Sequence, residues 1–149
     1  MTRINKEQIK QVCIQKQDAL IESYKQREQD LKNDIYTRRE SASQSEDRNT
    51  GKAELLAALG NELVFAQQEM GYLNLLDVTN ESICVEPGAV VITNHLNFFI
   101  GVSSEKVEVE GVIIYGISTK APIYASMLGL EKGGSFQFNE TSYIIEDMY

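Results

Sequence analysis

The stretch "LLAALGNELVFAQQEMGYL" (residues 55–73) decides the fold, because its apolar residues recur at helical spacing. Alternating steps of three and four residues join the members of one stripe, which are Leu56, Leu59, Leu63, Ala66, Met70 and Leu73. Such a repeat is a heptad seam, along which one helix packs against another. The stretch therefore predicts a long helix over residues 50–76 with a partner helix beside it.

The partner helix is predicted over residues 6–40, which contain no Gly or Pro and consist mostly of good helix formers. Its apolar residues are few but suit a helix: Ile9, Val12, Cys13, Leu20, Tyr24, Leu31 and Ile35. With only a short polar turn between them, the two helices would pack as an antiparallel coiled-coil hairpin. A hairpin of this length cannot hide inside a small core, so we expect it to project.

After residue 77 the chain changes to short runs rich in Val, Ile, Phe and Tyr, which are typical of strands. The runs are "AVVITN" (89–94), "NFFIGV" (97–102), "VEVEGVIIYGIS" (107–118), "SFQFN" (135–139) and "SYIIEDMY" (142–149). One short helix fits between them, "APIYASMLGL" (121–130), with Pro122 in its first turn and Gly129 near its end. The expected fold is α+β: a hairpin over residues 1–77, then a small, mostly antiparallel sheet domain with one helix over residues 78–149.

Charge restricts the classes of partner. The 149 residues carry a net charge of −8, which disfavours duplex nucleic acid as the main ligand. Residues 1–77 hold 11 basic and 13 acidic residues, whereas residues 78–149 hold 3 and 9. The polar start "MTRINKEQIKQ" resembles neither a signal peptide nor a membrane span, and two distant cysteines suit a reducing compartment. We expect a soluble, cytoplasmic protein that does not bind membranes.

An ordinary enzyme site is hard to find in the sequence. His95 is the only histidine and falls in a probable turn, "TNHLN", where a surface position is the usual outcome. A catalytic pair of Cys84 and His95 would need a third residue to orient it, and the sequence indicates none. Cys13 falls on the apolar side of a helix and is interpreted as a small core residue. The segment "EKGGS" (131–135) follows a helix and is typical of a turn rather than of a phosphate-binding loop. We therefore expect no active site of the protein's own.

The turn between the helices, "SASQSEDRNTGK" (41–52), leaves two interpretations open. Asn49 or Thr50 could cap the second helix, with the neighbouring acids Glu46 and Asp47 merely solvated. Alternatively, acids at the end of a rigid arm could deliver carboxylates to Mg²⁺ in a cavity of another protein, because Mg²⁺ takes one or two carboxylates and keeps its waters. The basic residues near this tip would suit a nucleic-acid phosphate: Arg38, Arg39, Arg48 and Lys52.

The arrangement resembles the bacterial Gre transcript-cleavage factors, which combine an N-terminal coiled coil, an acidic tip and a C-terminal domain of FKBP-like fold. Members of that family carry a stretch like I-S-P-x-S-P-L-G-x-A-L-L-G-K-x-x-G-D and a closing Tyr-x-Ile. Matching positions here are Ile117, Ser118, Pro122, Ala125, Leu128, Gly129, Gly133, Tyr143 and Ile145. The chain departs from the pattern at Thr119, Ala121, Tyr124 and Ser135. Clear motif matching covers about the last forty residues.

The resemblance implies binding at the secondary channel of RNA polymerase. The loop of Ser118, Thr119, Lys120, Ala121 and Pro122 corresponds to the surface that contacts the channel rim. The hairpin would reach inward, where tip acids share Mg²⁺ with the polymerase and lie near the RNA 3′ end or the DNA. A monomer with no tightly bound cofactor is expected.

The tip departs from the cleavage-competent pattern D-x-x-E. Counting three positions from Glu46 reaches Asn49, and from Asp47 it reaches Thr50. We therefore expect an elongation regulator whose stimulation of cleavage is weak or absent. The first alternative is a true cleavage factor that uses Glu46 and Asp47, with Asn49 beside them at the tip. The others are a peptidyl-prolyl isomerase suggested by the FKBP-like fold alone and a coiled-coil interaction protein unrelated to transcription.

Overall fold

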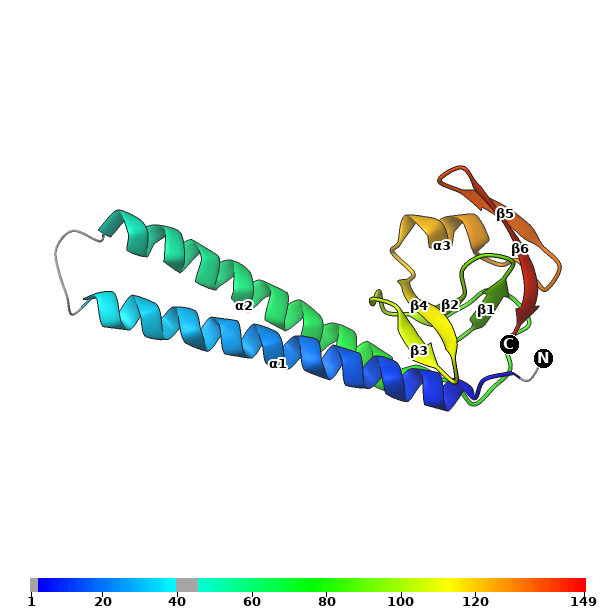
Figure 1. The fold of residues 1–149 in the computed structure, drawn as a ribbon, viewed down its shortest axis with the longest axis horizontal. Helices are drawn as coiled ribbons and strands as arrows, with labels where there is room; N and C mark the ends of the chain where they lie inside the picture. Colours follow the sequence, from blue (N-terminus) through cyan, green and yellow to red (C-terminus); the bar gives the residue numbers. More distant parts are fainter. Residues whose placement is uncertain (1–2, 40–45) are drawn as a thin grey trace. The chain divides into compact units, whose positions relative to one another are not determined.

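The computed structural model describes residues 3–39 and 46–149, with side chains described for residues 3–36 and 51–149. Two long helices, α1 (Lys6–Arg39) and α2 (Glu46–Leu75), come first (Figure 1). Six strands follow, with the short helix α3 (Pro122–Met127) between the fourth and fifth strands. The α+β fold predicted from the sequence is confirmed.

Helix α1 starts with a side-chain cap and continues because nothing in its sequence interrupts it. Asn5 Oδ1 accepts a hydrogen bond from the backbone N–H of Gln8 at 3.2 Å, which satisfies one of the free N–H groups of the first turn. Pairs four residues apart line its exposed side, among them Gln11 with Glu7 at 3.0 Å. The start at Lys6 is where the sequence predicted it.

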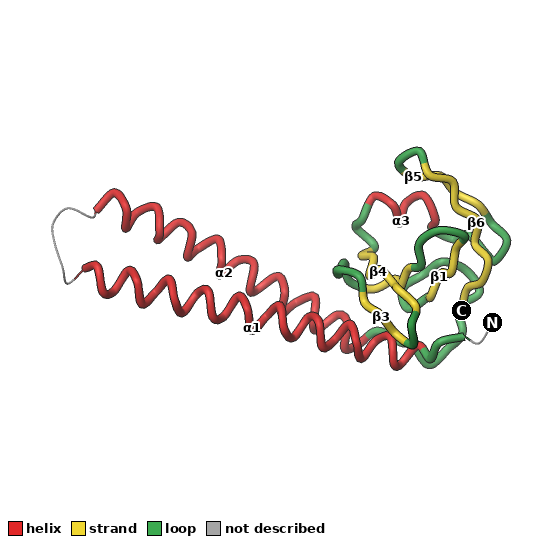
Figure 2. Tube along the Cα trace, in the orientation of Figure 1, coloured by secondary structure: helices red, strands yellow, loops and turns green. Residues whose placement is uncertain are grey.

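Helix α2 begins at Glu46, four residues before the predicted start at residue 50. It runs antiparallel to α1, as the tube in Figure 2 shows. The predicted seam faces inward: Ala66 and Leu73 are buried, and the other four positions are half-buried, namely Leu56, Leu59, Leu63 and Met70. Few of these side chains are fully covered, because two helices alone cannot enclose a core.

The facing stripe on α1 differs from the expected one by one position. Leu20 is 42% exposed, whereas Ile21 is buried at 6%. Gln17, which sequence reasoning passed over, is only 5% exposed, and its Nε2 donates to the Ala66 carbonyl at 2.9 Å. Polar residues at single seam positions of coiled coils can specify the register of the helices, and we predict this role for Gln17.

The strands are β1 (Val90–Thr93), β2 (Phe98–Gly101), β3 (Val107–Val109), β4 (Val112–Ser118), β5 (Ser135–Phe138) and β6 (Thr141–Met148). They form one sheet in the order β3-β4-β2-β1-β6-β5. Neighbours pair antiparallel except β2 and β4, which are parallel. The sheet is therefore mixed, which refines the expected mostly antiparallel sheet.

Two tight turns fold neighbouring strands back on each other as hairpins. Glu110 and Gly111 have φ of 52° and 79°, so the run 107–118 is divided into β3 and β4. Asn139 and Glu140, with φ of 50° and 65°, connect β5 to β6. Consecutive residues with positive φ form the turns whose twist matches that of antiparallel strands.

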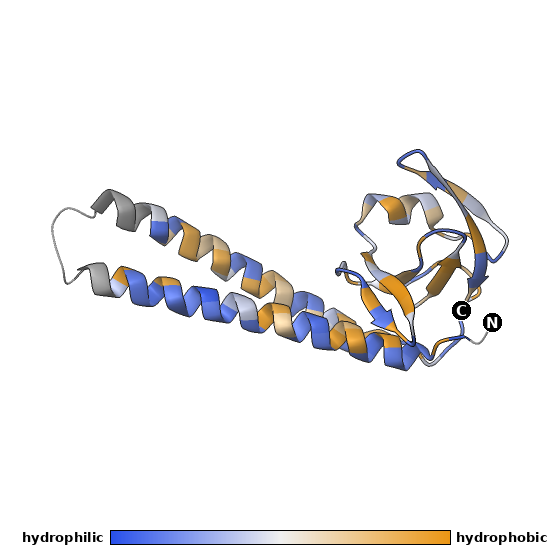
Figure 3. Ribbon diagram, viewed as in Figure 1, coloured by the Kyte–Doolittle hydropathy of each residue, from blue (hydrophilic) through white to orange (hydrophobic). Residues whose placement is uncertain are grey.

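Each face of the sheet is covered by helix. On one face, Val90, Phe99 and Ile114 pack with apolar residues from the start of α1 and the end of α2, which are Ile9, Cys13 and Leu73. On the other face, Ile123 and Met127 of α3 pack in a cluster that includes Val91, Phe98, Ile100 and Ile145. Figure 3 shows the corresponding hydrophobic bands on the strands and on the helix ends near them.

The chain divides into two compact units. One comprises residues 1–16 together with 71–149, and the other comprises residues 17–70. The predicted bounds, 1–77 and 78–149, cut across the first unit, because the first turns of α1 and the last turns of α2 supply part of the core over the sheet. We call these segments, residues 6–16 and 71–75, the helix roots.

Candidate functional site

Of the predicted tip, the structure describes residues from Glu46 onward, and residues 46–50 in their backbone alone. Helix α1 extends to Arg39 and α2 begins at Glu46, so Glu46 and Asp47 belong to the first turn of a helix. Carboxylates are electrostatically favoured at that position. The side chains of six predicted tip residues lie outside the described part of the chain: Arg38, Arg39, Glu46, Asp47, Arg48 and Asn49. Delivery of Mg²⁺ by this tip remains a prediction.

Lys52 is the tip residue whose side chain is described. Its Nζ forms an ion pair with the Asp34 carboxylate of α1, and the Lys52 side chain is 22% exposed. Lys52 therefore joins the two helices on the tip side of the hairpin. Further down, a shallow groove of about 470 Å³ is lined by both helices, including Arg27 and Leu31 of α1 and Leu59 of α2.

The predicted docking loop, residues 118–122, is a tight turn that presents polar and small side chains. Ser118 Oγ accepts from the Lys120 N–H at 3.0 Å, and the Ser118 carbonyl accepts from the Ala121 N–H at 3.0 Å. Ser103 Oγ accepts from the Ser118 N–H at 3.3 Å and ties the turn to the loop after β2. Three of its side chains are exposed, those of Thr119, Lys120 and Pro122, and Ser118 and Ala121 are half-buried.

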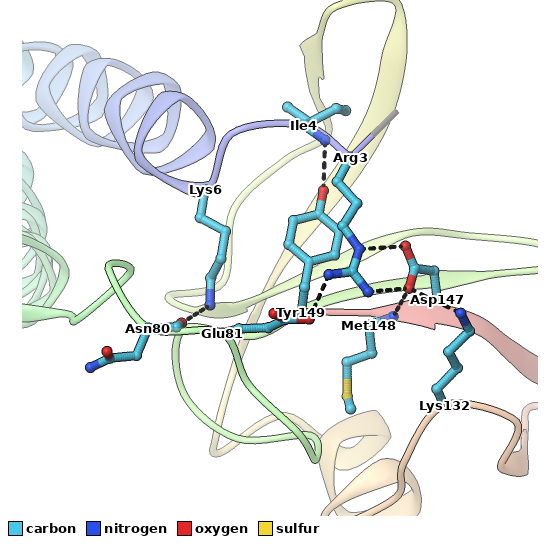
Figure 4. A network of polar contacts seen from close by, with 9 residues as sticks. All are labelled: Arg3, Ile4, Lys6, Asn80, Glu81, Lys132, Asp147, Met148 and Tyr149. Atoms are coloured by element: carbon cyan, nitrogen blue, oxygen red, sulfur yellow. Dashed lines mark hydrogen bonds and ion pairs between the residues drawn. The ribbon is translucent and has the colours of Figure 1, made fainter. Parts of the chain in front are cut away.

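A second polar cluster, drawn in Figure 4, joins the two ends of the chain. Arg3 Nε and Nη2 donate to the two oxygens of Asp147 at 3.0 and 2.9 Å, and Nη1 donates to Glu81. The guanidinium lies 4.9 Å from the ring centroid of Tyr149. The Tyr149 hydroxyl in turn accepts from the backbone N–H of Ile4 at 2.9 Å. We call this cluster, Arg3, Ile4, Glu81, Asp147 and Tyr149, the terminal clasp.

The clasp shifts the ionisation of its members in opposite directions. Hydrogen bonds from Arg3 hold the pKa of the Asp147 carboxyl below its ordinary value, and those to Asp147 and Glu81 raise the pKa of Arg3. Burial raises the pKa of the Tyr149 phenol, which is 5% exposed. Both partners of the Arg3–Asp147 pair therefore stay charged at neutral pH. The two parallel hydrogen bonds of this bidentate ion pair fix the relative orientation of the guanidinium and the carboxylate.

Lys6 and Asp77 organise the connection after α2. The Lys6 side chain is buried, and its Nζ donates to the Asn80 carbonyl at 2.9 Å. Burial lowers the pKa of this ammonium, although nearby carboxylates oppose the effect. Asp77 accepts from the Thr79 N–H and hydroxyl and from Asn80, which lowers the pKa of its carboxyl.

Two cavities flank the clasp. One, of about 590 Å³, lies between the start of α1 and residues 78–81, and it is open, with both polar and apolar residues in its lining. The other, of about 530 Å³, has Ile92 and Val112 among its lining residues, with His95 and Lys132 also lining it. Arg3, Ile4 and Tyr149 line both, so the clasp separates them.

The histidine and the cysteines make no catalytic arrangement among the described residues. His95 is exposed and meets the Tyr143 ring edge-on at 5.6 Å between centroids. Burial raises the pKa of the Cys13 thiol to about 11, and burial and nearby carboxylates raise that of Cys84. A thiol is a weak nucleophile until it ionises. In the part of the chain with described side chains, no group of His, Cys, Asp and Glu is arranged to hold a metal ion.

Sequence reasoning did not find the clasp. Arg3 belongs to a short polar start, and nothing in its neighbourhood signals a partner at residue 147. The one available signal was Tyr149, an aromatic residue at the end of an apolar strand, which the sequence analysis interpreted only as part of that strand.

None of the described helices is long and apolar enough to cross a membrane.

Comparison with known proteins gives structural matches alone. No family model and no curated protein matches the chain. Among solved structures, GreA factor homolog 1 (Gfh1) of Thermus thermophilus matches at 14% identity and a TM-score of 0.35, over 91% of this chain and 94% of that one. A second structure, titled as the transcription factor Gfh1, matches at the same identity and TM-score over 93% and 94%. Values this low carry no argument about what this chain does.

Proposed function

We propose that this protein is a transcription elongation regulator that binds RNA polymerase at its secondary channel and has no active site of its own. In this proposal the loop 118–122 contacts the channel rim and the hairpin of α1 and α2 enters the channel. Stimulation of transcript cleavage is weak or absent, because the tip lacks the second spaced carboxylate. The regulator acts as a monomer in the cytoplasm and shares Mg²⁺ with the polymerase at most.

The observation that carries the proposal is where the Gre-like motif falls in the fold. Pro122 occupies the first turn of α3, where its fixed φ suits a helix. Gly129 and Gly133 have φ of 78° and 88°, a region that glycine enters without strain. These matched residues thus define a specific loop–helix–turn unit, and it follows a long helical hairpin in the chain, as in the Gre family.

The isomerase alternative finds little support in the aromatic residues. Such enzymes use an apolar pocket lined by aromatic rings, whereas Phe98, Phe99 and Phe136 are at most 8% exposed and belong to the packed core. Phe136 stacks on Tyr143 with a 4.7 Å separation between ring centroids. Side chains committed to the core cannot contact a substrate.

The proposal is tested by binding of purified protein to bacterial RNA polymerase core enzyme, measured by size-exclusion co-elution and by fluorescence titration. We expect one chain to bind per polymerase, and Lys120→Glu to weaken binding. Lys106→Glu is the matched control, because Lys106 is equally an exposed lysine of the same unit. Lack of binding by the folded wild-type chain would refute the proposed function. Equal effects of the two variants would move the contact away from the loop 118–122.

A further inference from the structure

Two loops of the sheet-containing unit are joined by backbone hydrogen bonds into a fixed surface. The N–H of Val85 donates to the Leu130 carbonyl at 2.8 Å, and the N–H of Gly129 donates to the Val85 carbonyl at 3.2 Å. Val85 is buried beneath them at 1% exposure. The loop before β1 and the loop after α3 are thereby held side by side.

Large aliphatic side chains stand out from both loops. Ile83 is 79% exposed and Leu128 is 59% exposed, whereas Val85 and Met127 close to them in the chain are buried. Single exposed aliphatic residues are common on protein surfaces. Here, however, two large aliphatic side chains are exposed on neighbouring loops that hydrogen bonds hold together, and apolar surface that is exposed within one region is typical of interaction sites.

Acidic side chains flank this feature. Cys84 Sγ lies 3.8 Å from Glu86 Oε2, and the negative charges of Glu86 and Glu131 both contribute to the raised pKa of the Cys84 thiol. No ion pair within 4 Å joins either carboxylate to a described residue, although burial lowers the pKa of the Lys6 ammonium and the charge of Glu86 opposes that shift. Lys132, beside Glu131 in the sequence, pairs with Asp147 at 3.7 Å. We call Ile83, Cys84, Glu86, Leu128 and Glu131 the acidic–apolar patch.

We propose that the acidic–apolar patch is a docking surface for a protein segment that carries Lys or Arg beside aliphatic side chains. The exposed carboxylates of Glu86 and Glu131 repel nucleic acid and anionic lipid surfaces, which leaves a cationic protein as the complementary class. Aliphatic side chains of that segment would cover Ile83 and Leu128, while its cations would meet Glu86 and Glu131. The patch consists of residues from the loop before β1 and the loop after α3 and shares no residue with the loop 118–122, so this inference does not rest on the proposed function.

The apolar half of the proposal is tested with amphipathic peptides of leucine and lysine, and of leucine and glutamate, titrated into the full chain. The wild type is expected to bind the leucine–lysine peptide about tenfold more tightly than the leucine–glutamate peptide. Ile83→Ser with Leu128→Ser should lose most of the affinity for the leucine–lysine peptide, because the leucines of that peptide lose the apolar surface that they cover. The matched control is Ile113→Ser with Ile144→Ser, because these isoleucines are also exposed, at 45% and 51%, but lie elsewhere on the sheet. Equal losses in the two double variants would overturn the proposal.

The charged half is tested with Glu86→Gln and Glu131→Gln against Glu105→Gln and Glu108→Gln, two exposed acids outside the patch. The first pair should reduce both the affinity for the leucine–lysine peptide and its dependence on salt, and the second pair should leave them nearly unchanged. If both pairs act alike, the peptide senses only the overall negative charge and the proposal fails. Polymerase binding is scored separately on Lys120→Glu, so either proposal can fail without the other.

Discussion

The guanidinium of Arg3 meets the carboxylate of Asp147 through two parallel hydrogen bonds, of 3.0 and 2.9 Å, across 144 positions of the chain. Ile4 follows Arg3 and is buried at 6% in the core beneath the helix roots. Tyr149 follows the end of β6 and receives both the Arg3 guanidinium over its ring and the Ile4 N–H at its hydroxyl. The segment that leads into α1 is thus fastened to the last strand of the sheet.

The first prediction is that Arg3→Ala lowers the melting temperature of the sheet-containing unit. Arg3→Lys should recover only part of the loss, because an ammonium cannot reproduce the two-pronged contact with Asp147. Arg27→Ala is the control, since Arg27 is an exposed arginine of α1 outside the sheet-containing unit, and its described contact is the Tyr24 ring at 5.9 Å. In a double-mutant cycle, Arg3→Ala and Asp147→Asn should be non-additive. Fully additive effects would show that the pair is not coupled.

The second prediction concerns the stability of the folded protein at acidic pH. The pKa of Asp147 is lowered in the folded protein, chiefly by Arg3, so the unfolded chain binds more protons over the acid range. The resulting stability is present above the unfolded pKa of about 4 and is lost as the pH falls through the folded value. Asp147→Asn should flatten this part of the stability–pH curve, and Arg3→Ala should flatten it similarly. Urea unfolding at a series of pH values checks both. An unchanged slope in both variants would contradict the assignment.

The third prediction separates glycines that the fold needs from those that it does not. Gly71 lies in α2, and an added Cβ would meet nothing within 4 Å, so Gly71→Ala should stabilise the protein by up to about 1 kcal/mol through helix propensity. At Gly116 of β4 an added Cβ would lie 2.4 Å from Ser104 Oγ and 2.5 Å from the Val102 carbonyl oxygen. Gly116→Ala should therefore destabilise the folded protein, because the added methyl group would clash with these atoms. Chemical denaturation measures both, and the same sign for the two would refute the argument.

The fourth prediction concerns the buried amide of the hairpin. Gln17→Ala removes the hydrogen bond to the Ala66 carbonyl and leaves space beside it, and should cost about 1–3 kcal/mol. Gln17→Leu fills the space with an apolar side chain and should restore stability while weakening the choice of helix register. Amide hydrogen exchange over residues 17–70 reports local stability, and cysteine crosslinking across the seam reports register. A single crosslinking register in Gln17→Leu would show that Gln17 does not specify it.

The sequence predicted those elements whose signal is local. Strand runs and the short helix were found because β-branched and aromatic residues cluster between turn residues, and the seam of α2 was found because its leucines recur regularly. Helix α1 was harder. Gln17 replaces an apolar residue in its stripe, and the choice between Leu20 and Ile21 depends on the partner helix. The parallel pairing of β2 with β4 is also non-local, since the β3–β4 hairpin must return past β2 before the pairing exists.

The candidate sites show the same difference between local and non-local sequence signals. The loop 118–122 could be placed from its motif, because Pro122 and Gly129 have local backbone roles. The terminal clasp and the acidic–apolar patch could not, since each joins segments that are distant in the chain. Exposed Ile83 and Leu128 look in the sequence like any other core residues. Their exposure depends on the hydrogen bond between Val85 and Leu130, which brings together two loops that are distant in the chain.

The last prediction concerns the tip, where helix α2 begins at Glu46. Catalysis by a shared metal depends on the charge and position of its ligands, and Asn49 stands where a second spaced carboxylate is needed. We expect the wild type to stimulate cleavage of a backtracked transcript poorly and Asn49→Glu to raise that activity. Glu62→Gln, an exposed acid elsewhere on α2, is the control. Glu46→Ala with Asp47→Ala should leave polymerase binding nearly unchanged, because docking is assigned to the loop 118–122. Strong cleavage by the wild type that this double change abolishes would instead identify a true cleavage factor, one in which an adjacent acidic pair suffices.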